Sequence, residues 1–270
     1  MSGTFEVGRP EDYLTRLAAS GLGRAYKTLV IEELGVQRGD FVVDLGCGPG
    51  ADLTNFAHGV GPTGRVLGID HDSEAIGEAV RAASNLAQVT VRQADIHHLD
   101  LANGSVDRVH TDRVLQHVAD PEAVVAETAR VLRVGGVAGF AEPDWDTLVI
   151  DYPDPAVPVA YRRFITDRVV RNSRVGRRIP ALCERNALTV TRVIPVTAVF
   201  RDATQADRVL GFQRVTRRAV DAGYLAGEDA AAWLAHLRTH RFFASVTLFV
   251  TLASLSVPND RKGGRSLTGE

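Results

Sequence analysis

Residues 40–50 read Asp-Phe-Val-Val-Asp-Leu-Gly-Cys-Gly-Pro-Gly, a short apolar run that ends in a glycine-rich turn. Continuous apolar runs of this length are typical of strands that are buried on both faces of a parallel sheet. Gly46 and Gly48 carry no side chain, so the backbone of the turn can approach a ligand closely. The stretch therefore predicts a buried strand whose carboxyl end lies at a binding site.

Strands and helices alternate on the carboxyl side of this turn. Four further apolar runs predict strands, at residues 65–70, 89–95, 106–115 and 137–141. Asp72 or Ser73 is expected to cap the helix that follows the first of these strands, and Asp120 with Pro121 is a typical helix start. This alternation predicts βαβ units and therefore a mainly parallel sheet.

The second half of the chain has weaker patterns. Helices are expected at residues 159–172 and 179–186, and two more helices are expected within residues 203–241. Two long apolar segments, residues 188–200 and 242–255, predict closing strands that run antiparallel to each other.

The composition argues against several classes of protein. The formal net charge is −2, so no overall field draws the chain toward nucleic acid or an anionic membrane. No segment has the roughly 18–20 apolar residues of a spanning helix, and we expect a cytoplasmic location. Two cysteines cannot form a disulfide framework or a four-cysteine zinc site. The two lysines, Lys27 and Lys262, lie near the ends, so we expect none inside the fold.

Acidic residues close three successive predicted strands, at Asp44, Asp70 and Asp95. Carboxylates at one rim of a sheet are costly unless they bind a ligand, and Asp70 is placed to accept the hydroxyls of a ribose. The spacing Gly46-x-Gly48-x-x-Ala51 also fits a dinucleotide fingerprint. That fingerprint would suit NAD and a dehydrogenase. Asp44 argues against this interpretation, because its negative charge would repel the pyrophosphate of NAD but suits a ligand with an ammonium or sulfonium group.

Five segments, at residues 43–50, 66–70, 93–95, 105–109 and 130–136, follow one another in a characteristic order. They resemble the motifs of the class I S-adenosylmethionine-dependent methyltransferases, and the resemblance covers residues 36 to about 146. Within that family the chain is most similar to small-molecule enzymes of the ubiquinone and menaquinone type and their relatives in natural-product biosynthesis. The resemblance implies an α/β fold, a doubly wound Rossmann-like sheet of seven mostly parallel strands with an antiparallel last strand, plus a helical cap.

The resemblance also implies S-adenosylmethionine as cofactor and S-adenosylhomocysteine as product. Asp70 would hold the ribose hydroxyls, Asp95 would bind the adenine amino group, and Ile96 would pack on the adenine ring. The backbone of the glycine turn would line the methionyl and ribose parts, with Asp44 near the methionyl amino group. The full set of expected cofactor residues is Asp44, Gly46, Cys47, Gly48, Asp70, His71, Asp95, Ile96, Thr111 and Arg113.

A general base is needed only for some acceptors, and two histidines near the end of the fourth strand could supply it. His117 is the first candidate because it lies just past the strand, near the expected methyl group, and His110 is the second. Residues after the fifth strand and in an amino-terminal lid are expected to line the acceptor, namely Glu142, Asp144, Trp145 and Tyr13.

The expected organisation is a helical lid over residues 1–37, a methyltransferase domain over residues 38–257 and a flexible tail over residues 258–270. Cap insertions are expected at about residues 150–180 and 203–241. The expected partner is a small-molecule acceptor, and neither a membrane nor a nucleic acid is expected as a partner. The chain would be a monomer or homodimer.

Two alternatives keep the same fold. The domain could bind the cofactor and catalyse a reaction other than methylation. It could also methylate tRNA or rRNA through residues 162–178, which contain seven arginines and one acid. His236 and His240 have the spacing of a metal pair on a helix, but the glutamate of the zinc-protease pattern is missing, and no metal is expected.

Overall fold

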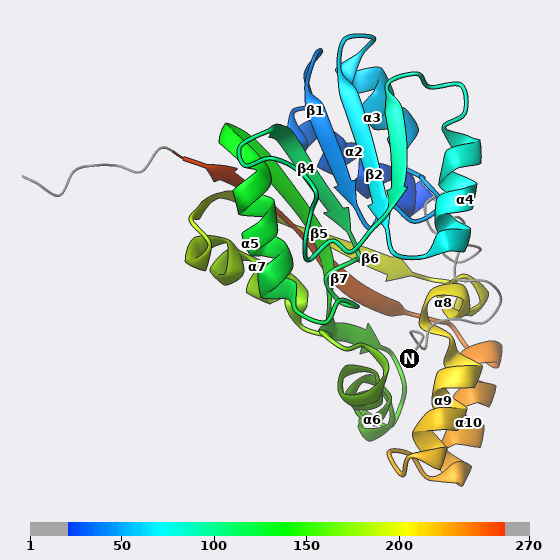
Figure 1. Cartoon of the computed structure of the whole chain (residues 1–270). Helices are drawn as coiled ribbons and strands as arrows, with labels where there is room; N and C mark the ends of the chain where they lie inside the picture. Colours follow the sequence, from blue (N-terminus) through cyan, green and yellow to red (C-terminus); the bar gives the residue numbers. More distant parts are fainter. Residues whose placement is uncertain (1–20, 257–270) are drawn as a thin grey trace, which may run out of the picture.

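The computed structural model describes residues 21–256 and contains a seven-stranded sheet in the order β3-β2-β1-β4-β5-β7-β6 (Figure 1). Strands β1 to β5 and β6 run in one direction, and β7 pairs antiparallel with both β5 and β6. The expected fold class is therefore confirmed. The strands are β1 (Phe41–Leu45), β2 (Arg65–Asp70), β3 (Val89–Gln93), β4 (Val106–Asp112), β5 (Leu132–Ile150), β6 (Leu188–Phe200) and β7 (Ala244–Leu255).

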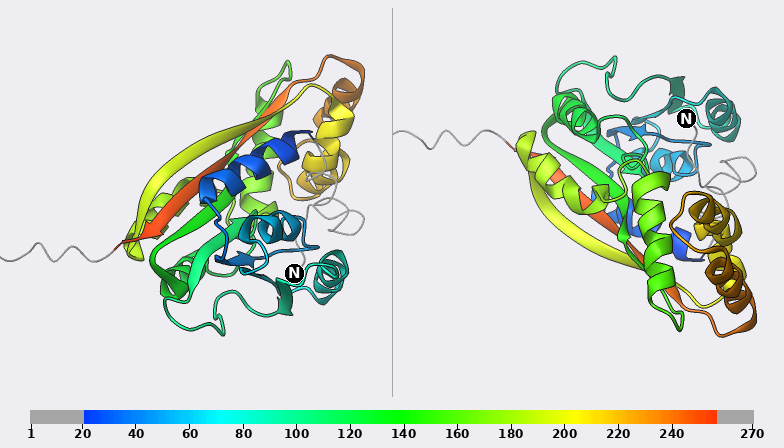
Figure 2. Two further views of the ribbon diagram at one scale, coloured as in Figure 1. Left: turned by 90° about the horizontal axis from the view of Figure 1, so that it is seen from above. Right: turned by 90° about the horizontal axis from the view of Figure 1, so that it is seen from below.

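Helices cover both faces of the sheet (Figure 2). Helices α2 and α3 pack on one face, whereas α5 and α7 pack on the other. Among residues 21–256, none of the helices has the length and apolar character to cross a membrane. The helices are α2 (Gly21–Leu34), α3 (Leu53–Val60), α4 (Ser73–Ala82), α5 (Pro121–Val131), α6 (Ala156–Phe164), α7 (Val175–Arg185), α8 (Ala203–Leu210), α9 (Phe212–Asp221) and α10 (Gly227–Thr239).

The caps of α4 and α5 are formed as the sequence predicts. The carboxylate of Asp72 accepts hydrogen bonds from the backbone of Glu74 and Ala75 at the start of α4. Asp120 likewise accepts from the first turn of α5, and Pro121 occupies the first position of that helix. Both caps satisfy N–H groups that have no partner within the helix.

Strand β5 is much longer than the predicted segment at residues 137–141. Strand β4 ends at Asp112, but β7 pairs with β5 from Val137 to Ile150 and so supplies hydrogen bonds beyond that point. The register shifts between Asp144 and Val149, which marks an irregularity in the long strand. The length of β5 thus depends on a partner strand about 100 residues later in the chain.

The helical segments of the second half differ from the prediction in their boundaries. Residues 203–241 form three helices because Gly211, with φ of 62°, adopts a left-handed conformation that ends α8. The helix expected at residues 159–172 is instead α6 followed by a short π-helix at Ile165–Val169.

Helices α6, α8, α9 and α10 form a lobe beyond the end of the sheet (Figure 1). Its core is separate from the two cores of the sheet and is built around Trp233 and Tyr161, both fully buried. The Tyr161 hydroxyl donates to the carbonyl of Leu210, and the Trp233 indole donates to Thr216. We refer to α6 and α8–α10 together as the helical lobe.

Helix α7 approaches β5 so closely at Gly176 that only glycine fits. A Cβ atom there would lie 2.5 Å from the carbonyl oxygen of Glu142. We expect Gly176→Ala to lower the free energy of unfolding by about 1–3 kcal/mol, as overpacking does elsewhere. Chemical denaturation would measure the change. Gly227→Ala is the control, since nothing lies within 4 Å of its Cβ position, and equal losses in the two variants would contradict the packing argument.

Candidate functional site

The glycine turn leaves the sheet at the end of β1 and is held by the neighbouring strand. The backbone N–H groups of Gly46 and Cys47 both donate to the carbonyl of Ile69, at 2.7 and 2.9 Å. Gly46 has φ of 73°, and a Cβ atom on it would lie 2.4 Å from Val114 Cγ2. Glycine is required at this position both for backbone conformation and for the close approach of the loop after β4.

Asp70 closes β2 and faces this turn. One carboxylate oxygen accepts from the N–H of Gly48 at 2.9 Å, and the other accepts from the N–H of Asp72 at 3.0 Å. Its side chain is 12% exposed, and His71 lies beside it at 3.2 Å with an exposed imidazole. Each oxygen of a carboxylate has two lone pairs, so both oxygens can accept further hydrogen bonds from a ligand.

Asp44 and His110 form a buried pair inside the sheet. They lie opposite each other on β1 and β4, and Asp44 Oδ1 is 2.7 Å from His110 Nδ1. Burial raises the pKa of Asp44, whereas the Asp44 carboxylate raises the pKa of His110 against the opposing effect of burial. Phe56 packs edge-on against the His110 ring at 5.1 Å. The geometry thus places His110 beneath the glycine turn and holds its imidazole on Asp44.

A network of ion pairs and hydrogen bonds, which the sequence analysis missed, holds helix α2 at the carboxyl ends of β1 and β4. The Lys27 ammonium pairs with Asp52, which follows the glycine turn, and with Asp112 at 2.7 Å, at the end of β4. The Tyr26 hydroxyl donates to Asp112 at 2.8 Å, and the Arg113 guanidinium pairs with the same carboxylate at 3.0 Å. The expectation that no lysine lies inside the fold is wrong, because the Lys27 side chain is 11% exposed.

The charges of this network are strongly coupled. Burial alone would raise the pKa of Asp112, but the cations of Arg113 and Lys27 hold it well below the usual range. Burial would lower the pKa of Lys27, but Asp112 and Asp52 raise it instead. The second carboxylate oxygen of Asp52 is buried and makes no hydrogen bond within residues 21–256. This oxygen of Asp52 can therefore still accept a hydrogen bond from a cationic or hydrogen-bond-donating ligand.

Glu142 is fully buried and holds the loop that follows β4. Its carboxylate accepts backbone hydrogen bonds from Val114 at 2.8 Å, Leu115 at 2.7 Å and Gln116 at 3.3 Å. Burial raises the pKa of Glu142 to about 8 despite these donors. The side chain is therefore mainly protonated at neutral pH, holds the loop backbone through its carboxyl oxygens and has no exposed surface for an acceptor.

Asp144 and Trp145 also make internal contacts. The Asp144 carboxylate is fully buried and bonds to the Arg177 guanidinium, with one contact at 2.9 Å. The Trp145 indole donates to the Gln116 side chain at 2.9 Å and belongs to the core of the helical lobe. These residues join β5, α7 and the loop after β4.

His117 lies in that same loop with an exposed surface. Crowding by protein atoms, together with the cations of Arg113 and Arg171, lowers the pKa of His117 to about 4. Its backbone N–H donates to the carbonyl of Val114 at 2.9 Å, which fixes the turn. The imidazole is therefore neutral at physiological pH, and its low pKa makes it a weaker base than an ordinary histidine.

The remaining expected site residues are placed unevenly. Asp95 follows β3 with its side chain 67% exposed, and the backbone N–H and imidazole of His97 lower its pKa. Ile96 is buried in the core under α5. Thr111 is fully buried and lies on the face of the sheet opposite to that of its neighbours His110 and Asp112. Tyr13 lies outside the described residues.

These groups gather where the strand order reverses. Neighbouring strands β1 and β4 lead to chain segments on opposite sides of the sheet, and ligands of open α/β sheets bind beyond the carboxyl ends at such a point. The glycine turn, Asp70, Asp112 and the loop with His117 all border it. We call this region the cofactor edge, since its acceptors suit a ligand with hydroxyl groups and positive charge.

Comparisons with known proteins identify relatives of the chain. Residues 37–174 match a family described as a methyltransferase domain. An uncharacterized 37.1 kDa protein in transposon TN4556 of Streptomyces fradiae is 49% identical over 251 residues, which cover 92% of this chain and 73% of that protein. A demethylmenaquinone methyltransferase of Lactobacillus johnsonii is 30% identical over 139 residues, or 50% of this chain and 57% of that enzyme.

A solved structure shares the fold at low sequence identity. Geranyl diphosphate C-methyltransferase from Streptomyces coelicolor A3(2), in complex with Mg²⁺, geranyl diphosphate and S-adenosylhomocysteine, superposes with a TM-score of 0.58. The match covers 93% of this chain and 84% of that one, at 19% identity.

The Lys27 network makes α2 part of the cofactor edge. We expect Lys27→Met to weaken binding of S-adenosylhomocysteine by roughly 10-fold, because loss of the cation leaves Asp52 and Asp112 unbalanced and frees α2 from the edge. Calorimetric titration would measure the change. Lys27→Arg keeps the charge and is expected to retain most of the affinity, so a similar loss in both variants would contradict a charge-based role.

Proposed function

The chain belongs to the S-adenosylmethionine-dependent methyltransferases, and we propose that it transfers the methyl group of that cofactor to a small organic acceptor. The observation that carries the proposal is the cofactor edge, where the glycine turn and the Asp70 carboxylate meet at 2.9 Å. The demethylmenaquinone methyltransferase of Lactobacillus johnsonii is named for a small organic substrate, which supports the acceptor class.

The residues of the cofactor edge suit S-adenosylmethionine. Asp70 has lone pairs left for ribose hydroxyls, and the orphaned oxygen of Asp52 offers an acceptor to the methionyl ammonium group. We assign the turn of Gly46, Cys47 and Gly48 to backbone contact with the ligand. The Asp95 carboxylate is bonded to His97 but exposed, with lone pairs left for an adenine amino group. The side chains of Asp44, Ile96 and Thr111 are buried and would act by shaping the edge.

The chain contributes alignment, and the cofactor supplies an activated methyl group on a sulfonium. Loop residues after β4 border the expected path of the methyl group, and Glu142 fixes their backbone. Holding both reactants in line in a dry site can contribute up to about 7–11 kcal/mol. For an oxygen or nitrogen acceptor, we assign His117 to accept the proton at its imidazole, while His110 stays paired with Asp44.

The arginine-rich segment at residues 162–178 has structural contacts within the fold, which favours a small acceptor over RNA. Arg174 bonds to Asp146 and Arg177 bonds to Asp144, so two of its arginines hold α7 against β5. We propose that the helical lobe and the segment at residues 150–180 cap the acceptor. Trp145 joins the lobe to the loop of His117 through Gln116, so acceptor contacts in the lobe would be transmitted to the site.

Substitution of Asp70 tests the cofactor assignment. Asp70→Asn keeps one carbonyl acceptor for the turn but removes the charge, and we expect S-adenosylhomocysteine to bind roughly 10- to 150-fold more weakly, as for loss of a charge-assisted hydrogen bond. Calorimetric titration measures the affinity, and Asp100→Asn at an exposed position is the control. Unchanged affinity in Asp70→Asn would place the ribose elsewhere.

The depressed pKa of His117 predicts a specific titration. The imidazole should stay neutral until the pH falls to about 4, instead of titrating near 6.5 like an ordinary histidine. NMR titration, with the signal assigned by its absence in His117→Ala, would measure the midpoint. With an oxygen or nitrogen acceptor, His117→Ala should also lower kcat, by less than the roughly 100-fold expected of a base whose pKa lies near the working pH. A midpoint near 6.5 would show that the ring is not crowded as described.

A further inference from the structure

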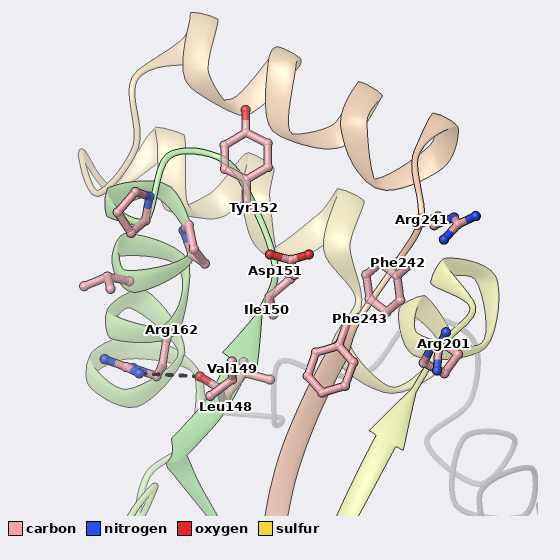
Figure 3. A pocket seen from close by; sticks show the side chains of 13 residues that line it. Leu148, Val149, Ile150, Asp151, Tyr152, Arg162, Arg201, Arg241, Phe242 and Phe243 are labelled. Carbon is pink, nitrogen blue, oxygen red and sulfur yellow. Dashed lines mark hydrogen bonds between the residues drawn. The ribbon is translucent and has the colours of Figure 1, made fainter.

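A cavity of about 610 Å³ lies away from the cofactor edge, where the end of β5 meets the start of α6 and the segment before β7 (Figure 3). Its size is within the range of pockets that bind small molecules. Neither the glycine turn nor the loop after β4 lines it. None of the residues assigned to the cofactor or to proton transfer therefore lines this cavity.

The floor of the cavity is apolar and exposed. Val149 is 52% exposed, Val159 is 49% exposed and Phe243 is 37% exposed. They are three of the seven large apolar side chains that stand exposed among the described residues, and all three line this cavity. The neighbours of Val149 in β5, Leu148 and Ile150, are buried in the core of the helical lobe, so Val149 faces the opposite side.

Three arginines border the apolar floor. Arg162 lies on one side and donates a long hydrogen bond of 3.5 Å to the Leu148 carbonyl, while Arg201 and Arg241 lie on the other side (Figure 3). Arg201 and Arg241 make no ion pair or hydrogen bond with residues 21–256. Asp151 is the one acid among the described lining residues, so positive charge dominates.

The cavity is displaced along the sheet from the end of β4, where the cofactor edge lies. Ala141, beside the end of β4, pairs with Val250 of β7, whereas Val149 pairs with Ser245. The offset of five residues between these partners on β7 corresponds to roughly 17 Å of strand. A ligand in the cavity would thus be held separately from the reacting atoms.

We propose that this cavity is a second ligand site, which binds a small molecule with an apolar body and a carboxylate or phosphate group. The apolar body lies on Val149, Val159 and Phe243, and the anionic group pairs with Arg201 and Arg241. Guanidinium groups form charge-assisted, often bidentate hydrogen bonds to carboxylates and phosphates, which gives the site its preference for anions.

Calorimetric titration with decyl phosphate tests the proposal in the full chain saturated with S-adenosylhomocysteine. We expect one molecule to bind per chain, with 1-decanol and inorganic phosphate each binding at least about 10-fold more weakly, since each lacks one half of the ligand. Decanoate is expected to bind as well. Arg201→Gln with Arg241→Gln should weaken decyl phosphate by roughly 10-fold.

The matched control is Arg168→Gln with Arg217→Gln, two exposed arginines outside the cavity with the same change of charge. It should bind decyl phosphate within about 2-fold of the parent chain. Thermal melting confirms that both double variants fold. Equal losses in the two double variants, or equal binding of 1-decanol and decyl phosphate, would overturn the proposal. Sedimentation with phosphatidylglycerol vesicles but no binding of decyl phosphate would also overturn it, in favour of a membrane surface.

Discussion

The buried carboxyl group of Glu142 fixes the loop after β4, and the geometry of the site depends on that constraint. By accepting the N–H groups of Val114, Leu115 and Gln116, it holds three consecutive residues that leave the sheet. Val114 is thereby pressed into the space that Gly46 leaves open, which joins the ends of β1 and β4. Buried N–H groups need partners, so a loop in this position requires an acceptor inside the fold.

The same loop connects the sheet with the helical lobe. Its carbonyl groups are also engaged, because the Asn172 side chain donates to the carbonyls of Leu115 and Val118 at 2.9 and 2.8 Å. The Gln116 side chain accepts from the indole of Trp145 at 2.9 Å. A movement of the lobe would thus displace Gln116 and Val118, the residues on either side of His117. This coupling gives a physical route by which a bound acceptor could complete the site.

Local signals in the sequence were sufficient for the order of the first strands and for the starts of α4 and α5, because a buried strand, a glycine turn and a cap at Asp72 or Asp120 each involve only a few adjacent residues. The Lys27–Asp112 pair could not be predicted in that way, since its partners are 85 residues apart and meet only when α2 docks. Glu142 was expected to line the acceptor because it closes a strand. The structure turns it inward, where the loop backbone needs an acceptor. The length of β5 was missed because β7 determines it.

The two binding regions have opposite charge, and this favours independent occupation. Asp52, Asp70 and Asp112 border the cofactor edge, which suits a cationic ligand, whereas Arg201 and Arg241 border the distal cavity, which suits an anion. Along β7 the two regions are offset by roughly 17 Å. The screening length is about 8 Å at physiological salt, so salt weakens the field of the exposed Arg201 and Arg241 at that range, whereas the buried carboxylates of Asp52 and Asp112 are screened much less. A ligand in the cavity can therefore influence the methyl acceptor through packing in the lobe and, more weakly, through the field of the buried charges.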